Sequence, residues 1–311
     1  MNKKEKYPLR GVVISLDTPF DSRGRVDLAS LERCVEFHIQ EGAVGFLAAA
    51  QASEVYTLKT SERMQILQCV RAATLGKVEL FASATSKEDR ERFMVAERAT
   101  QMGCDGVLVE VPEELKKNSG AILEFFRDFA KVGMRTLMIQ DLSWYGAGMP
   151  LPLIAQLFDE IQPFRCLKVE TVPSCPKYTA IHTMTGGLLH ISGGWASLQL
   201  LEALDRGIDA IMPTGMTRWY RRIFDAHGRG ERDEARKLYQ KLLPVLAFTQ
   251  QHLDISIQFH KRFSYHRGLF SSTKVRAPSI MYDEVHERCA EELIRYIDSL
   301  DGWETPAPRL T

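Results

Sequence analysis

Short apolar runs alternate with amphipathic stretches along the first part of the chain, up to about Met212. Eight runs rich in β-branched residues are typical of strands. Between most of them, apolar residues recur at three- and four-residue steps, as they do on one face of a helix. Repeated strand–helix units predict an α/β fold with parallel strands. The eight runs are Gly11–Leu16, Gly45–Ala50, Val78–Ala82, Gly106–Val111, Thr136–Gln140, Cys166–Glu170, Leu188–Ser192 and Ile208–Met212.

The number of units favours a closed barrel over an open sheet. An open doubly wound sheet has the same alternation, but the chain lacks the GxGxxG turn that often marks one. From about Met216 the alternation stops, and residues 231–252, 256–270 and 283–300 read as helices. We therefore expect a TIM (β/α)8 barrel over residues 1–220. A C-terminal helical region, residues 221–311, would pack on the barrel or supply a subunit interface.

Composition excludes several partners. The 311 residues carry 40 basic and 40 acidic side chains, so nothing indicates binding to nucleic acid. No apolar run is long enough to span a membrane. The six cysteines form no CxxC pair, which favours reduced thiols and a cytoplasmic location. No histidine spacing indicates a metal site and no nucleotide fingerprint is present, so neither a metal nor a cofactor is expected.

A lysine interrupts the sixth predicted strand. Lys168 lies between Leu167 and Val169, in a strand whose neighbours are buried-type residues. Burial favours the neutral amine, and a neutral amine attacks a carbonyl carbon to form a Schiff base. Glu170 points to the same side of the strand and could pair with the lysine or move protons. A purely structural ion pair of Lys168 with Glu170 or Glu110 is the open alternative.

Several short motifs, in their order, resemble the dihydrodipicolinate synthase / N-acetylneuraminate lyase family of class I aldolases and dehydratases. The resemblance runs from about Leu9 to Ile297 and implies a TIM barrel with Lys168 as the Schiff-base lysine. It also implies a small 2-oxo acid substrate and a homo-oligomer, either a dimer or a tetramer. The motifs are Thr18-Pro19-Phe20, Ala50-Gln51-Ala52-Ser53-Glu54, Asp105-Gly106-Val107-Leu108-Val109, Lys168, Gly193-Gly194 and Met212-Pro213.

The loop after the second strand departs from the family's GTTGE motif. In the family, the threonines and backbone N–H groups of this loop hold the substrate carboxylate. Here the two hydroxyls are lost, while backbone N–H groups and new polar side chains remain available. The resemblance therefore implies a substrate-binding set of Gln51, Ala52, Ser53, Glu54, Gly193 and Gly194. Glu54 has a simpler interpretation, as a loop anchor that accepts backbone N–H bonds.

The fifth strand carries a larger departure. The family ends this strand in Tyr-Asn or Tyr-Asp and uses the tyrosine to shuttle protons, but this chain has Gln140-Asp141. An amide can orient a carbonyl but cannot serve as general acid or base. Glu170, Tyr145, Tyr56 or a water would then have to move protons. The arginine that binds the second substrate in synthase members is also absent near Tyr145, which argues against true dihydrodipicolinate synthesis.

Trp144, Trp195 and Trp219 fall in predicted C-terminal loops, where they line a pocket or simply pack the loops. The leading hypothesis is a Schiff-base lyase, an aldolase or dehydratase acting on pyruvate or a 2-keto-3-deoxy acid. One alternative is a binding or regulatory protein that kept the scaffold and lost turnover. Another is a hydrolase or hydratase that uses Glu170 and Glu54 without a covalent intermediate.

Overall fold

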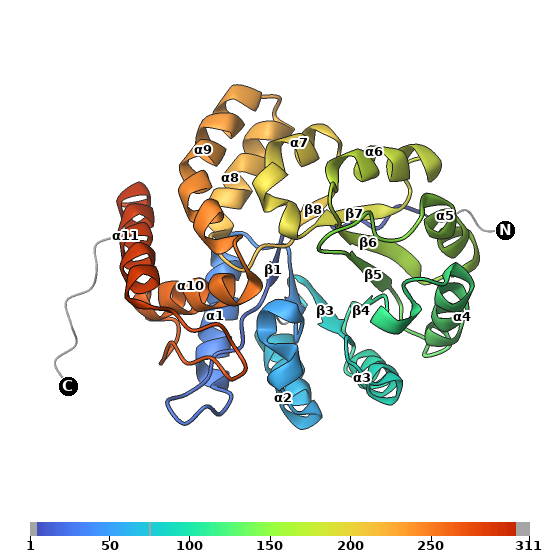
Figure 1. Cartoon of the computed structure of the whole chain (residues 1–311), viewed down its shortest axis with the longest axis horizontal. Coiled ribbons are helices and arrows are strands. Elements are labelled where there is room, and N and C mark those ends of the chain that lie inside the picture. The colour runs from blue at the N-terminus through green and yellow to red at the C-terminus, as the bar shows by residue number, and fades with distance from the viewer. Residues whose placement is uncertain (1–4, 75, 303–311) are drawn as a thin grey trace.

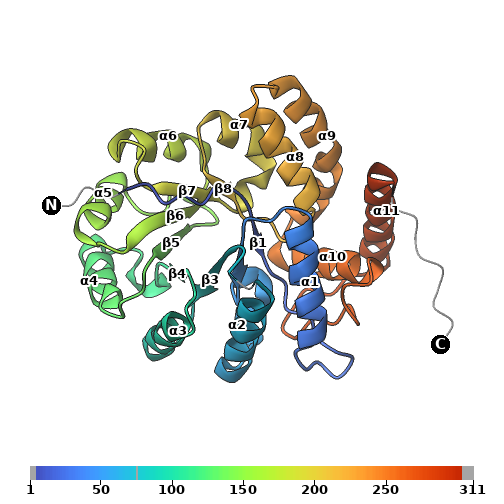
Figure 2. The ribbon, with the colours of Figure 1, turned by 180° about the vertical axis from the view of Figure 1, so that it is seen from behind.

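The computed structural model describes residues 5–74 and 76–302, which form a barrel of parallel strands ringed by helices (Figures 1 and 2). Each strand pairs with the next in sequence, and β8 closes the barrel against β1. The predicted TIM (β/α)8 barrel is confirmed. The strands are β1 Gly11–Ser15, β2 Gly45–Ala48, β3 Glu79–Ser83, β4 Gly106–Glu110, β5 Leu137–Leu142, β6 Phe164–Glu170, β7 His190–Gly193 and β8 Ala210–Ile211.

A helix follows each strand, and three further helices continue beyond the barrel (Figure 1). Within the described part of the chain, no helix is both long and apolar enough to cross a membrane. The barrel helices are α1 Leu28–Gln40, α2 Thr60–Thr74, α3 Asp89–Gln101, α4 Ser119–Ala130, α5 Leu151–Glu160, α6 Cys175–Met184, α7 Leu200–Asp205 and α8 Thr217–Gly228. The C-terminal helices are α9 Arg232–Thr249, α10 Leu253–His266 and α11 Glu284–Asp301.

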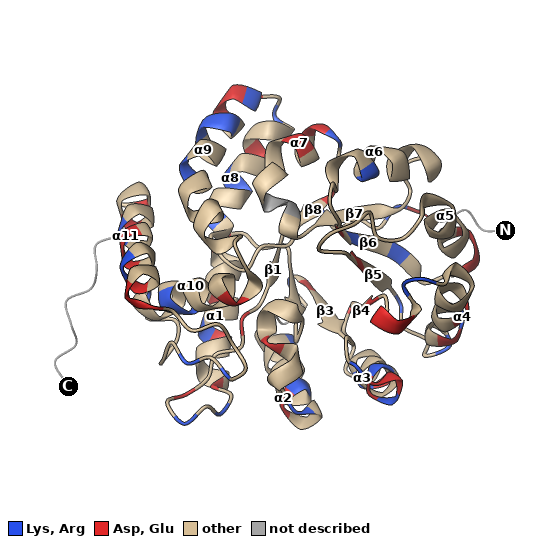
Figure 3. Cartoon of the chain, viewed as in Figure 1, with Lys and Arg blue, Asp and Glu red and all other residues tan. Residues whose placement is uncertain are grey.

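Two of these helices, α6 and α8, are absent from the sequence prediction. Helix α6 buries only Cys175, Tyr178 and Ile181, which is a weak apolar stripe to detect. Helix α8 sets exposed arginines against buried aromatic residues such as Trp219 and Tyr220 (Figure 3 colours the basic residues blue). The boundary expected at residue 220 falls inside α8. Because α8 packs on β1 as the eighth barrel helix, we propose that the C-terminal extension begins with α9.

Strand side chains alternate between two cores because successive residues of a strand point to opposite faces. Outward residues such as Phe46 and Leu167 pack under the helices. Inward residues fill the barrel as an apolar layer of Val13, Leu47, Phe81, Leu108, Met138 and Cys166. The next inward position along six of the strands is polar: Ser15, Ser83, Glu110, Gln140, Lys168 and Ser192. The apolar layer is thus the floor on which a polar site is built at the C-terminal ends of the strands.

The C-terminal extension is tied to the barrel by a buried lysine. The side chain of Lys261, on α10, is fully buried, and its ammonium group contacts the Glu54 carboxylate in the loop after β2. The same ammonium donates to the Lys274 carbonyl at 2.9 Å. The N–H of Arg276 donates to the second Glu54 oxygen at 2.8 Å. The extension therefore holds the loop after β2 at the Glu54 carboxylate, and the Arg276 side chain adds a hydrogen bond to the Thr57 carbonyl at 2.9 Å.

This tether predicts a large stability effect for Lys261→Met. The substitution leaves the buried Glu54 carboxylate without its cation, and breaking a buried pair in this way costs about 3–5 kcal/mol. Denaturant unfolding should show this loss, while Lys274→Met, at an exposed neighbouring position, should change stability by less than about 0.5 kcal/mol. Equal midpoints and slopes for Lys261→Met and the parent protein would contradict the tether.

Candidate active site

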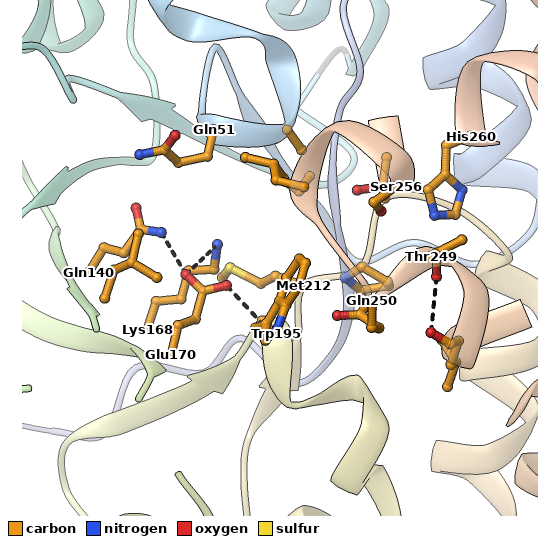
Figure 4. Close-up of a pocket in the computed structure, with 18 of the residues that line it drawn as sticks. Gln51, Gln140, Lys168, Glu170, Trp195, Met212, Thr249, Gln250, Ser256 and His260 are labelled. Carbon is orange, nitrogen blue, oxygen red and sulfur yellow. Dashed lines mark hydrogen bonds and ion pairs between the residues drawn. The ribbon is translucent and has the colours of Figure 1, made fainter. Parts of the chain in front are cut away.

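A cavity opens at the C-terminal ends of the barrel strands, and about 650 Å³ of space lies between its lining atoms, open mouth included. Figure 4 shows two groups of polar side chains in it. The first comes from β5 and β6, and the second comes from the junction of α9 and α10. We call the first group the catalytic end, formed by Gln140, Lys168 and Glu170. We call the second the distal polar group, formed by Gln250, Ser256 and His260.

Lys168 lies on an inward position of β6, in register with Gln140 of β5 and Ser192 of β7. Its side chain is 6% exposed, and its Nζ lies 3.3 Å from Glu170 Oε2. The sequence analysis left open whether Lys168 forms an ion pair with Glu170, and in the structure this ion pair is present. Since an isolated buried ammonium is strongly disfavoured, Glu170 holds the lysine inside the barrel. The amine still faces the cavity (Figure 4).

Glu170 is the hub of the catalytic end. Its Oε2 accepts a hydrogen bond from Gln140 Nε2 at 2.6 Å, and its Oε1 accepts one from the Trp195 N–H at 2.9 Å. A Cβ atom on Gly194 would overlap both this carboxylate and Lys168 Cε. Glycine at position 194 is thus needed so that β7 can end directly against the lysine and the glutamate. Gly194 lines the cavity, whereas Gly193 remains in the sheet, its carbonyl accepting from the Met212 N–H.

Gln140 orients this carboxylate. Its side chain is buried and lies opposite Glu110 on β4 and Lys168 on β6. The amide nitrogen is used by Glu170, while Oε1 is buried with no hydrogen-bond partner among the described residues. Because a buried carbonyl without a donor is disfavoured, this atom is available to a hydroxyl or water in the cavity.

The loop after β2 presents Gln51 and Ala52 to the cavity, in a short 3-10 turn, Gln51–Ser53. Gln51 Nε2 donates to Glu110 Oε2 at 2.9 Å. Glu110 Oε1 lies 3.5 Å from Lys116 Nζ, and among the described residues the ion-pair partner of Lys168 is Glu170 and not Glu110. Burial raises the pKa of Glu110, while Lys116 and Gln51 act in the opposite direction. Of the four residues of this loop that were expected to bind substrate, Gln51 and Ala52 therefore lie at the cavity.

Ser53 and Glu54 are placed differently from the expectation. The Ser53 hydroxyl contacts the Leu16 carbonyl and accepts the Ala50 N–H at 3.1 Å. Glu54 binds Lys261 and the Arg276 N–H, as its simpler interpretation as a loop anchor required. Neither residue lines the cavity. Their polar groups are used inside the protein, so in this structure they shape the loop.

Tyr145 is also displaced from the predicted role. Its side chain is 99% exposed and does not line the cavity, so it is not positioned to carry protons there. The loop after β5 turns Tyr145 outward and places Trp144 edge-to-face against Trp195, with ring centroids 5.1 Å apart. Trp144 and Trp195 line the cavity, whereas Trp219 is buried in α8 and donates to Asp301.

A buried ion pair fixes the loop after β5. Lys177 Nζ lies 2.5 Å from Asp141 Oδ2 and donates to the Met149 carbonyl at 2.8 Å. Asp141 Oδ1 accepts the Met149 N–H at 2.8 Å. Burial raises the pKa of Asp141, and the neighbouring Lys177 opposes that shift. Asp141, the second residue of the altered Gln140-Asp141 pair, therefore positions the Trp144 loop.

The distal polar group was missed by the sequence analysis. Gln250 follows α9, and Ser256 and His260 lie one turn apart on α10. The spacing of Ser256 and His260 indicated a helix. Which face of that helix meets the barrel depends on how α9 and α10 pack together against it. Among the described residues, no three His, Cys, Asp or Glu side chains gather as a metal site. The arrangement thus offers an amine, a carboxylate and neutral polar groups around one cavity.

Comparison with known proteins finds relatives that match nearly the whole chain. A profile of the Dihydrodipicolinate synthetase family matches residues 8–297. An L-2-keto-3-deoxyarabonate dehydratase from Azospirillum brasilense is 25% identical over 299 residues, covering 94% of each chain. An N-acetylneuraminate lyase from Shigella boydii is 38% identical over 104 residues, covering 33% of this chain and 35% of that protein.

Solved structures show the same fold. The crystal structure of dihydrodipicolinate synthase from Rhodopseudomonas palustris superimposes with a TM-score of 0.86 at 20% identity, covering 94% of this chain and 99% of that one. The family profile also covers the C-terminal helices, since it extends to residue 297. With Lys168 facing a cavity at the end of β6, the chain belongs to the dihydrodipicolinate synthetase family of Schiff-base lyases.

Proposed function

We propose that this protein dehydrates a 2-keto-3-deoxy acid through an imine on Lys168. The observation that carries the proposal is the buried Lys168–Glu170 pair, with the amine at the cavity surface. The L-2-keto-3-deoxyarabonate dehydratase that matches 94% of the chain supports the substrate class.

The first step forms the imine. The Lys168 ammonium transfers a proton to Glu170, 3.3 Å away, and the neutral amine attacks C2 of the substrate to give a carbinolamine. Glu170 returns the proton to the carbinolamine hydroxyl, which leaves as water while the protonated carbon–nitrogen double bond forms, so Glu170 is again a carboxylate. The substrate carboxylate would meet the backbone N–H groups of Gln51 and Ala52, because those of Ser53 and Glu54 already bond to Ala50 and Gln51 carbonyls. Gln140 Oε1 would accept from a substrate hydroxyl.

Elimination then needs one group that takes a proton and returns it. The Glu170 carboxylate removes the C3 proton, and the electron pair of that bond moves into the iminium to give an enamine. The enamine expels the C4 hydroxyl, which takes the proton from Glu170 and leaves as water. A final water hydrolyses the imine and frees the amine. Hydrogen bonds from Gln140 and the Trp195 N–H hold the carboxylate for both transfers.

The identity of the proton carrier favours dehydration over aldol cleavage. Cleavage requires removal of a proton from a poorly acidic alcohol, for which the family's tyrosine is suited as a stronger base. A carboxylate is a weaker base, but its acid form is a better proton donor to a leaving hydroxyl. Replacement of tyrosine by Gln140, with Glu170 beside the imine, therefore suits carbon–oxygen bond breakage.

We also propose that the protein is a cytoplasmic homo-oligomer, a dimer or a tetramer. Six free thiols support a reducing compartment. Large apolar side chains are exposed on the C-terminal extension, where they would be covered by a second subunit. They are Tyr265, Ile280, Met281 and Val285.

Borohydride trapping tests the imine. Incubation with pyruvate and borohydride should add the reduced pyruvyl mass to Lys168, since the amine faces the cavity. Lys168→Ala should give no adduct, and Lys131→Ala, at an exposed lysine outside the cavity, should react fully. Peptide mass spectrometry reads out the site. A binding or regulatory protein that has lost turnover would give ligand binding with no adduct on any lysine.

Glu170→Gln tests the proton carrier. The amide keeps the size of the side chain but cannot move protons, so turnover of a 2-keto-3-deoxy acid should fall by about 10²–10⁴-fold. The pyruvate adduct on Lys168 should form more slowly, because Glu170 also takes the lysine proton, but it should still accumulate on long incubation, which separates the loss of elimination from a loss of the imine. Turnover within about threefold of the parent would show that another group carries the proton.

A further inference from the structure

The cavity extends beyond the catalytic end, where a three-carbon acid would bind, to the distal polar group. Figure 4 shows Lys168 and Glu170 on one side and the distal polar group of Gln250, Ser256 and His260 on the other. Met212 and Trp195 lie between them in this view and also line the cavity. Strand β6 supplies the reactive amine, while the far wall comes from the C-terminal extension.

Two polar atoms of the distal group lack partners. Gln250 Oε1 and His260 Nδ1 are buried and form no hydrogen bond with other described residues. The His260 side chain is 5% exposed, and the Ser256 hydroxyl, on the same helix, is also buried. Buried polar atoms without partners are unusual in native proteins and lower the stability of the fold. A ligand hydroxyl that reaches this wall could donate to Gln250 Oε1, whereas His260 Nδ1 lies against Gly215.

The distal group carries no charge. Burial lowers the pKa of His260 to about 4, so its imidazole is neutral near pH 7. Among the described lining residues, Lys168 and Glu170 are the charged side chains apart from histidine, and both belong to the catalytic end. A second carboxylate or a phosphate is bound in proteins chiefly by arginine, lysine or several aligned N–H groups. The distal wall offers neutral side-chain donors and acceptors instead.

Apolar residues lie beside these polar groups. Leu246 and Leu253 come from the same helices, and Tyr220 from α8, and all three line the cavity. Apolar surface interrupted by single hydrogen-bonding groups suits a chain of carbons that bears hydroxyls. A short acid such as pyruvate would occupy the catalytic end and leave this wall without contacts.

We propose that Gln250, Ser256 and His260 form a subsite for the uncharged, hydroxylated tail of the substrate. The substrate is then a 2-keto-3-deoxy sugar acid with hydroxyls beyond C4, and its far end carries neither a second carboxylate nor a phosphate. This assignment rests on the proposed lyase function for the position of the carboxylate and C2. It adds a specificity element that the C-terminal extension contributes.

Calorimetric binding of three acids tests the subsite without any reaction. D-gluconate has a hydroxylated tail, D-glucarate ends that tail in a second carboxylate, and L-lactate has no tail. None has a ketone at C2, so none forms an imine. Gluconate should bind more tightly than either of the other two. Gln250→Leu and Ser256→Ala should each weaken gluconate by roughly threefold to tenfold and leave lactate unchanged.

Gln251→Leu is the matched control, because Gln251 is exposed beside Gln250 and does not line the cavity. It should bind gluconate like the parent protein. Gluconate affinities unchanged in both distal variants, gluconate binding no tighter than lactate, or tighter binding of glucarate would each overturn the subsite. Failure of borohydride trapping together with tail-dependent gluconate binding would instead overturn the imine chemistry alone.

Discussion

The ion pair between Lys168 and Glu170 is the constraint around which the site is built. An ammonium group inside a barrel is tolerated only with a partner, and Glu170 supplies it at 3.3 Å. The carboxylate in turn needs its own donors, which Gln140 and the Trp195 N–H provide. Gly194 lets β7 end against the pair. Each of these neighbours thus helps to keep the opposite charges of Lys168 and Glu170 buried together.

The C-terminal extension contributes twice to this site. Through Lys261 it holds Glu54 and so fixes the loop that carries Gln51 and Ala52. Through the junction of α9 and α10 it supplies the far wall of the cavity. In the proposed function, the barrel strands supply the reactive groups, while the extension shapes the loop that would bind the substrate carboxylate and the space for the rest of the substrate. Both the barrel and the extension therefore contribute residues to the lining of the cavity.

The fold was predictable from sequence because strand and helix periodicity is local. All eight strands lie where the apolar runs placed them, and Lys168 with Glu170 stood out as polar residues on one face of a strand. The residues that lie elsewhere than expected are positioned by long-range contacts. Ser53 and Tyr145 were assigned to the site by position in a loop, but their orientation depends on Leu16 and on the Asp141–Lys177 pair. His260 comes from a helix whose packing no local pattern reveals.

The most direct test of the imine assignment is a crystal structure of the protein soaked with pyruvate. The account predicts continuous density from Lys168 Nζ to C2 of pyruvate. The pyruvate carboxylate should lie at the Gln51–Ala52 backbone, and its methyl group should face Glu170. Pyruvate bound elsewhere, or bound in the cavity with clear separation from the amine, would contradict the central claim that Lys168 is the nucleophile.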